Sequence, residues 1–355
     1  MFMLKVKDFM YSLATDKYRG RLSFAWKPLF YLLSLFYGIT VGVLSFLKGI
    51  RPVKLACKVI SVGNITLGGT GKTPLVALIA EYLTQNGHKV AILSRGYKMK
   101  AGQGDEPAML LDILPDIPVI VDKDRIRGAQ KAIRDYSADT VILDDGFQQW
   151  GVSKDLEILT IDACCPFGNF HLIPRGIMRE RFFSLRRADI FVLTKTNWAG
   201  KEAVVNIRHS LNRVNPAAAV FSSSYVPVYF YELGREGLFL DTRGFKDKAV
   251  VLASGIAQPD SFLKMAGVLG METASHIVFN DHHHYSPQDI NRIIEEAKKA
   301  GVNTVITTEK DAAKFLPYLF IFHEEDIKVL ALRIQVKINE DEQGFYNRLL
   351  GVYTA

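Results

Sequence analysis

A glycine-rich stretch between a predicted strand and a predicted helix is the feature that most constrains this chain. Residues 61–74 have the sequence S-V-G-N-I-T-L-G-G-T-G-K-T-P, follow an apolar pair at 59–60 and precede a helical pattern at 75–83. A strand, a glycine-rich loop, Gly-Lys-Thr and a helix in this order are typical of a phosphate-binding loop. The backbone N–H groups of such a loop and the partial positive charge of the helix N-terminus both attract an anion.

The predicted nucleotide-binding residues are those of the loop itself: Thr66, Leu67, Gly68, Gly69, Thr70, Gly71, Lys72 and Thr73. Lys72 is expected to reach the β- and γ-phosphates of a nucleotide, and the Thr73 hydroxyl to bind Mg²⁺. The usual motif starts with glycine five residues before Gly-Lys, where this chain has Thr66. A glycine-rich turn without a ligand is the alternative, which the flanking strand and helix disfavour.

Length and composition favour a globular protein of two domains in a reducing compartment. The 355 residues suffice for two hydrophobic cores, and the three cysteines form neither a disulfide framework nor a zinc-binding spacing. The net charge of +7 comes from residues 1–60, which hold ten lysines and arginines against two aspartates. Basic residues around an apolar segment favour an anionic lipid surface as partner, and no basic-aromatic repeat points to nucleic acid.

The apolar segment Pro28–Phe46 has nineteen residues without a charge, the lower limit for a transmembrane helix. Positive residues flank both ends, so the positive-inside rule selects no orientation, and no signal-peptide cleavage site follows. We expect a helix that lies in or dips into the cytoplasmic leaflet, held by basic residues and by Trp26, Phe30, Tyr31 and Tyr37. A buried N-terminal helix is the alternative.

Apolar strands that alternate with helical segments predict an α/β fold with a doubly wound, mainly parallel sheet of the P-loop NTPase type. A β-rich, aromatic stretch at 218–233 predicts a connector to a second, smaller α/β domain. The alternating strand at 329–338 is expected to pair back with this connector. The predicted division is a membrane-associating segment at 1–50, a nucleotide-binding domain at 51–225 and a C-terminal domain with connector strands at 226–355.

Polar residues at the ends of predicted strands are the candidates for chemistry. Asp144 and Asp145 end one strand, where a carboxylate beside a phosphate loop can hold Mg²⁺ or its water. Two adjacent carboxylates are costly unless a cation lies near them, and a solvated strand end is the alternative. Asp105 lies in a loop after another strand, where an exposed carboxylate could face a substrate. Considered alone, such an aspartate more often stabilises a turn.

Histidine and arginine clusters leave more than one interpretation open. Histidines 282–284 point in different directions, so we expect no metal site from all three but a proton relay through one of them. The arginines of 171–189 suit phosphate binding, and a solvated basic helix is the alternative. In the sequence T-K-T-N at 194–197, Asn197 stands where guanine-reading GTPases have an aspartate, which disfavours a GTPase switch.

Seven short motifs follow one another along the chain. They are S-V-G-N-I-T-L-G-G-T-G-K-T-P at 61–74, S-R-G-Y at 94–97, G-D-E-P at 104–107, D-D-G-F-Q at 144–148, R-E at 179–180, D-H at 281–282 and T-E-K-D at 308–311. In order and spacing they resemble tetraacyldisaccharide 4′-kinase, the lipid A 4′-kinase of Gram-negative bacteria. Thr66 in place of glycine is that family's own pattern. This chain differs at Trp150, where histidine is frequent, and at Asn280, where proline is frequent.

The resemblance implies an ATP-dependent lipid kinase. Such an enzyme uses ATP and Mg²⁺ to phosphorylate the 4′-hydroxyl of a tetraacylated glucosamine disaccharide 1-phosphate, in a cleft between two domains. It also implies a peripheral or monotopic location at the cytoplasmic face of the bacterial inner membrane, and we expect a monomer that binds no nucleic acid. A nucleotide-dependent switch or ATPase, and a kinase for another amphiphilic sugar, are the alternatives.

Carried over by position, the resemblance also implies the site residues. Asp105 would be the catalytic base, oriented by His282 from the other domain. The implied Mg²⁺ ligands are Thr73, Asp144 and Glu180, with Asp145 beside them. The implied phosphate or substrate residues are Asp145, Arg125 and Arg179.

Overall fold

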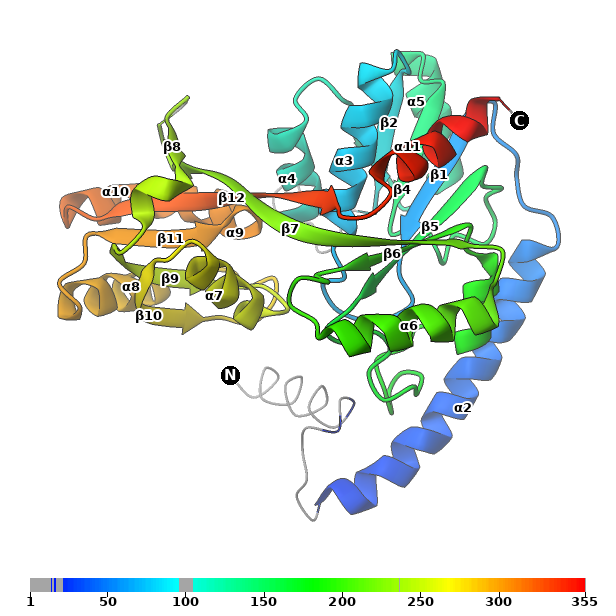
Figure 1. The fold of residues 1–355 in the computed structure, drawn as a ribbon, viewed down its shortest axis with the longest axis horizontal. Coiled ribbons are helices and arrows are strands. Elements are labelled where there is room, and N and C mark those ends of the chain that lie inside the picture. The colour runs from blue at the N-terminus through cyan, green and yellow to red at the C-terminus, as the bar shows by residue number, and fades with distance from the viewer. Residues whose placement is uncertain (1–13, 15, 17–21, 96–104, 236, 355) are drawn as a thin grey trace. The chain divides into compact units, whose positions relative to one another are not determined.

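The fold is taken from a computed structural model that describes residues 14, 16, 22–95, 105–235 and 237–354. These residues form two compact units, each with its own strands and helices (Figure 1). Unit 1 comprises Met1–Arg95, Leu114–Ser224 and Val336–Ala355, and unit 2 comprises Gly96–Ile113 and Tyr225–Gln335. The predicted α/β P-loop fold with a second, smaller α/β unit is confirmed.

Unit 1 contains a sheet with the strand order β7-β6-β5-β1-β4-β2-β3, in which neighbouring strands are parallel. The five strands between β7 and β3 are almost wholly buried apolar runs, which is typical of a parallel sheet covered on both faces. The strands are β1 (Lys58–Gly63), β2 (Val90–Ser94), β3 (Val119–Val121), β4 (Thr140–Asp144), β5 (Leu156–Asp162), β6 (Ile190–Thr194) and β7 (Ala219–Glu232). The helices are α2 (Leu22–Gly49), α3 (Lys72–Gln85), α5 (Arg125–Tyr136), α6 (Lys201–Val214), α11 (Glu342–Leu350) and the 3₁₀ helices η1 (Phe182–Arg187) and η4 (Gly351–Tyr353).

Unit 2 contains strands in the order β10-β9-β11-β12, with β12 next to β7 and the short β8 antiparallel to β7. The predicted pairing of the last strand with the connector is therefore observed. The strands are β8 (Phe239–Asp241), β9 (Ala249–Ser254), β10 (Glu272–Val278), β11 (Thr304–Thr308) and β12 (Lys328–Ile338). The helices are α4 (Asp105–Ile113), α7 (Pro259–Val268), α8 (Pro287–Lys299), α9 (Glu309–Phe315), α10 (Leu319–Glu324) and the 3₁₀ helices η2 (Thr242–Phe245) and η3 (Leu316–Tyr318).

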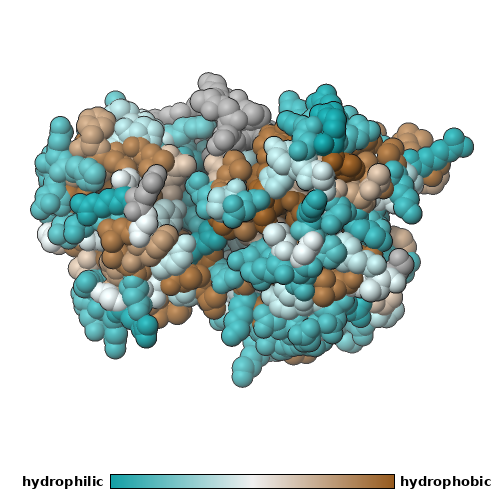
Figure 2. Space-filling view, turned by 90° about the horizontal axis from the view of Figure 1, so that it is seen from above, coloured by the Kyte–Doolittle hydropathy of each residue, from teal (hydrophilic) through white to brown (hydrophobic). Residues whose placement is uncertain are grey.

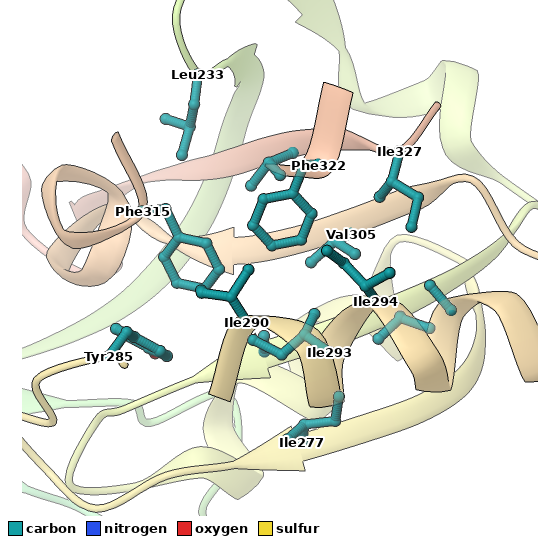
Figure 3. Close-up of a cluster of buried hydrophobic side chains, with 14 of the residues drawn as sticks. Leu233, Ile277, Tyr285, Ile290, Ile293, Ile294, Val305, Phe315, Phe322 and Ile327 are labelled. Atoms are coloured by element: carbon teal, nitrogen blue, oxygen red, sulfur yellow. The ribbon is translucent and has the colours of Figure 1, made fainter. Parts of the chain in front are cut away.

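The core of unit 2 forms around α8. Its buried Ile290, Ile293 and Ile294 have the spacing of one helix face, and a capping box closes the helix N-terminus. They share one buried cluster with Phe315 and Phe322, which come from α9 and α10 (Figure 3). This packing gives unit 2 a hydrophobic core of its own, as a second domain requires.

The two units differ from the predicted division in two segments. The prediction placed α4 in the nucleotide-binding domain at 51–225 and α11 in the C-terminal domain at 226–355. In the structure α4 packs on α9 within unit 2, and α11 packs on α3 within unit 1. The cause is that the chain passes between the units more than once, which local sequence patterns do not reveal.

The apolar segment near the N-terminus is the helix α2. By length and composition it is the one helix among the described residues that could cross a membrane, and its apolar window is only 17% buried. Thirteen of the 27 exposed large hydrophobic side chains in the described part of the chain lie between Trp26 and Ile50. The face drawn in Figure 2 shows hydrophobic patches next to hydrophilic surface. The alternative of a buried N-terminal helix therefore does not fit.

Candidate active site

The loop between β1 and α3 has the backbone of an anion cradle. Gly68 and Gly71 have φ angles of 113° and 86°, a left-handed conformation that glycine adopts without strain. Gly71 is the N-cap of α3 and provides no side-chain cap, so the first-turn N–H groups stay available to a ligand. Gly68 and Gly69 are exposed, whereas the side chains of Thr70 and Thr73 are buried. The loop thus presents the backbone of its glycines outward, while the side chains of Thr70 and Thr73 lie in the interior.

The anchors of this loop come from the ends of two neighbouring strands, and the sequence did not identify them as site residues. The Thr70 hydroxyl lies 2.8 Å from the Thr160 hydroxyl at the end of β5. Lys195, directly after β6, donates from Nζ to the Gly69 carbonyl at 2.8 Å and forms an ion pair with Asp162 at 2.6 Å. The sequence analysis considered Lys195 only as part of an incomplete guanine motif. Its position at the sheet edge that carries the phosphate loop was the signal that could have identified it.

The paired carboxylates lie beside the phosphate loop. Parallel pairing aligns Asp144 with Val62 of β1, and the Asp144 side chain is buried. Asp145 accepts a hydrogen bond from Arg179 Nη1 at 2.7 Å, and Lys72 Nζ is 3.7 Å from the same oxygen. Burial by itself would raise the pKa of Asp145, but Lys72 and Arg179 outweigh it and lower the pKa to about 2. Lys72 and Arg179 therefore supply the positive charge that two adjacent carboxylates require.

Two arginines support the same strand end. Arg125 is only 2% exposed and donates from Nη1 to the Asp122 carbonyl and from Nη2 to the Asp144 carbonyl, the latter at 3.3 Å. Burial lowers the pKa of Arg125, and the carboxylates of Asp144 and Asp145 oppose that shift. Its Nε has no hydrogen-bond partner among the described residues. Arg179 also donates to the Asn64 side chain at 3.2 Å, so it joins the carboxylates to the start of the phosphate loop.

Glu180, which the resemblance places among the Mg²⁺ ligands, is held by cationic and amide donors. Arg187 donates to its two carboxylate oxygens at 2.9 and 3.0 Å, and Gln148 donates to one of them at 3.0 Å. In the part of the chain that the structure describes, no three His, Cys, Asp or Glu side chains lie together as a metal site. Among the described residues, Glu180 is therefore not part of a cluster of three such side chains.

The oxygen donors near the loop nevertheless fit Mg²⁺. Thr73 supplies a hydroxyl in the first turn of α3, and Asp144 supplies a carboxylate at the end of the strand next to β1. Mg²⁺ is bound by few protein carboxylates because phosphate oxygens and water complete its coordination. A cluster of three acidic side chains is therefore not required at this position.

The predicted catalytic base and its partner both belong to unit 2. Asp105 is the first residue of α4, and its side chain falls outside the described part of the structure. His282 has a φ of 59°, and its Nε2 lies 3.6 Å from the Asp281 carboxylate. Lys310 holds the other Asp281 oxygen at 2.9 Å. In the division into compact units, α4 groups with the unit that also contains His282, and the roles of Asp105 and His282 stay predictions.

The other groups near His282 have separate partners. His283 Nε2 lies 3.1 Å from Asp289, and His284 is exposed. The fully buried Asp311 of the T-E-K-D motif accepts from the Gly255 N–H at 2.8 Å. The motif thus fixes the loop after β9 and positions Asp281 through Lys310, functions that the sequence analysis did not assign.

Comparison with known proteins gives consistent matches across the chain. A family model described as "Tetraacyldisaccharide-1-P 4'-kinase" matches residues 26–354. Tetraacyldisaccharide 4′-kinase of Halothermothrix orenii is 34% identical over 330 residues, which cover 84% of this chain and 85% of that protein. The enzyme of Syntrophus aciditrophicus is 35% identical over 291 residues, covering 75% and 78%. A crystal structure of LpxK from Aquifex aeolicus in complex with ATP is 26% identical, with a TM-score of 0.66, over 89% of this chain and 97% of that one.

Proposed function

We propose roles for these residues on the premise that the chain belongs to the tetraacyldisaccharide 4′-kinase family. As a member of this family it is an ATP-dependent kinase that phosphorylates the 4′-hydroxyl of a tetraacylated disaccharide 1-phosphate in lipid A biosynthesis. ATP and Mg²⁺ are its cofactors. A switch or ATPase without lipid kinase activity is not favoured.

The observation that carries the assignment of roles is the charge network at the phosphate loop. The loop N–H groups and Lys72 bind the β- and γ-phosphates, and Arg179 neutralises charge that develops during transfer. The Lys72 ammonium is 3.7 Å from Asp145, beyond hydrogen-bond length, so it is held in place by attraction and can move onto a phosphate. Asp145 thereby orients both cations before ATP binds. Arg125 is a positioning residue: its hydrogen bond to the Asp144 carbonyl holds the strand end that carries Asp144 and Asp145.

Mg²⁺ would be held by Thr73 and Asp144. When bound, the ion neutralises phosphate charge. Glu180 would be a further Mg²⁺ ligand only if Arg187 released one of its carboxylate oxygens, and would otherwise act on the ion through a water molecule. Without the ion, the Arg187 guanidinium neutralises the buried Glu180 carboxylate.

The acceptor hydroxyl needs a base, because an alcohol attacks a phosphoryl group poorly while it keeps its proton. We assign this role to Asp105 and an orienting role to His282. The support on the side of His282 is the chain of contacts from its ring to Asp281 and from Asp281 to Lys310. These contacts fix the position of the imidazole beside a carboxylate, as the role of an orienting residue requires.

The lipid acceptor requires the enzyme to work at a membrane surface, and α2 is the element suited to it. Ser34 donates to the Leu172 carbonyl at 2.8 Å, and the Tyr37 hydroxyl donates to the Arg179 carbonyl at 3.0 Å. A spanning α2 would pull these irregular backbone segments into the hydrocarbon, where they are not tolerated. We therefore assign α2 to a monotopic position, with its exposed apolar side in the anionic cytoplasmic leaflet. The protein is assigned as a monomer.

The direct test is transfer of labelled γ-phosphate from ATP to an acylated disaccharide 1-phosphate, with the phosphate position of the product mapped. We expect label at the 4′ position and ATP consumption that depends on the acceptor. ATP turnover that is the same with and without acceptor would instead indicate an ATPase or switch. Label at another hydroxyl or on a different amphiphilic sugar would change the acceptor assignment while keeping the kinase activity.

A further inference from the structure

We propose that a groove between α2 and residues 172–187 binds one anionic phospholipid of the bilayer. One of its two acyl chains would lie along α2 and its phosphate at Arg181. The groove has a volume of about 400 Å³, within the range of about 300–1,000 Å³ of ligand pockets. The inference rests on the membrane association proposed above and adds a specific lipid site to it.

Two glycines on α2 create the groove. A Cβ at Gly38 would come within 2.6 Å of Leu172 Cδ1, so the absence of a side chain there lets α2 pack closely on residue 172. A Cβ at Gly42, one turn further on, would meet nothing within 4 Å. The helix is therefore in contact at Gly38 and borders open space at Gly42. This space is the part of the groove that an acyl chain can occupy.

The wall of the groove continues into the lipid-facing side of α2. Ile39 and Val43 line the groove and also belong to the exposed hydrophobic residues of the helix. Phe183 of η1 lines the other wall and is exposed as well. An acyl chain can thus pass from the bilayer into the groove along apolar surface, which lowers the cost of entry.

The charge of the groove selects an anionic head group. Of its two arginines, Arg187 is neutralised by Glu180. Arg181 is exposed, has no ion-pair partner among the described residues, and its Nε lies 3.5 Å from the position of a Cβ at Gly38. An exposed guanidinium in the lining of the groove suits a phosphodiester, to which it can donate two hydrogen bonds.

The size and charge of the groove favour a bilayer phospholipid over the acceptor as its occupant. The acceptor has four acyl chains and its sugar must reach the phosphate loop, whereas the groove has the volume of a single small-ligand site. A phospholipid bound here would hold η1, and with it Arg187 and Glu180, against α2. The lipid would therefore support the same segment that carries Arg179.

The test measures lipid retained by the full-length protein. The protein is purified in a neutral detergent, incubated with phosphatidylglycerol or phosphatidylcholine, and analysed by native mass spectrometry. We expect about one phosphatidylglycerol per chain and at least about tenfold weaker binding in Gly42→Leu, which fills the groove, and in Arg181→Gln, which removes the head-group donor. Thr40→Leu, an equally apolar change on the exposed side of α2, and Arg51→Gln, an equal change of charge, are the matched controls and should bind as the wild type does.

Three outcomes would overturn the proposal. Phosphatidylglycerol binding that is unchanged in both groove variants would remove the site. Equal losses in the groove variants and their controls would indicate general surface electrostatics. A higher KM for the acceptor in Gly42→Leu with phosphatidylglycerol binding intact would make the groove an acceptor subsite. Kinase activity in phospholipid-free micelles is measured in parallel and should persist in all four variants, so that failure of this proposal is distinguishable from failure of the kinase and anchor assignments.

Discussion

Replacing Lys195 by methionine tests whether the end of β6 holds the phosphate loop in its binding conformation. The Lys195 ammonium lies 2.6 Å from Asp162 and donates to the Gly69 carbonyl at 2.8 Å. The Lys195 and Asp162 side chains are 4% and 2% exposed. Methionine keeps most of the apolar stem of lysine but removes its charge and its hydrogen-bond donor.

The expected loss of stability in Lys195→Met follows from the burial of the ion pair between Lys195 and Asp162. Removing one partner of a buried ion pair lowers the free energy of unfolding by about 3–5 kcal/mol, because the remaining charge stays in a low dielectric. Asp162 also accepts from the Cys164 N–H at 2.9 Å, so we expect the lower end, about 3 kcal/mol. The double variant Asp162→Asn, Lys195→Met removes both charges and should recover at least about 1 kcal/mol of that loss. Loss of the donor to Gly69 should weaken ATP binding by about tenfold.

The assay combines urea unfolding of the single and double variants with equilibrium binding of ATP. Lys201→Met, at an exposed position at the start of α6, is the control for loss of a lysine charge and should leave both quantities unchanged. A Lys195→Met protein with wild-type stability would refute the account of the buried pair. A destabilised protein with wild-type ATP affinity would show that the pair supports the fold but does not shape the loop.

The remaining predictions concern the site and the anchor. Asp105→Asn should lower kcat by at least about a hundredfold, as for loss of a general base, with ATP affinity unchanged; wild-type turnover would remove Asp105 from catalysis. Asp145 has its pKa lowered to about 2, so the ionised carboxylate stabilises the fold above its ordinary pKa of 3.8, and this contribution disappears as pH falls through about 2. Asp145→Asn should therefore cost about 1–2 kcal/mol at pH 7 and progressively less between pH 4 and 2; a pH-independent difference in urea unfolding would contradict this. Deleting residues 1–48 should abolish flotation with anionic liposomes, and undiminished flotation would refute the anchor role of α2.

The phosphate loop shows what local sequence is able to specify. Its glycines, its Gly-Lys-Thr and the flanking strand and helix are contiguous, so the motif can be recognised before the distant residues that hold it are known. The strand endings at Asp144 and Asp145 were recognisable for the same reason, because an apolar run followed by acids marks the edge of a parallel sheet. Alternating strands and helices were sufficient to predict the α/β class. The apolar segment near the N-terminus was sufficient to predict a helix, and in the structure the apolar window of α2 is only 17% buried.

Tertiary structure decided which distant residues meet. Nothing local to Lys195 shows that it binds the Gly69 carbonyl, since that contact depends on the order in which β5, β6 and β1 pair. The ion pair of Glu180 with Arg187 likewise depends on the path of the chain through η1. The placement of α4 with α9 follows from the chain passing more than once between the units. Sequence by itself determined the chemistry available along the chain, whereas packing determined which groups share a site, because sheet order and chain crossings are properties of the whole fold.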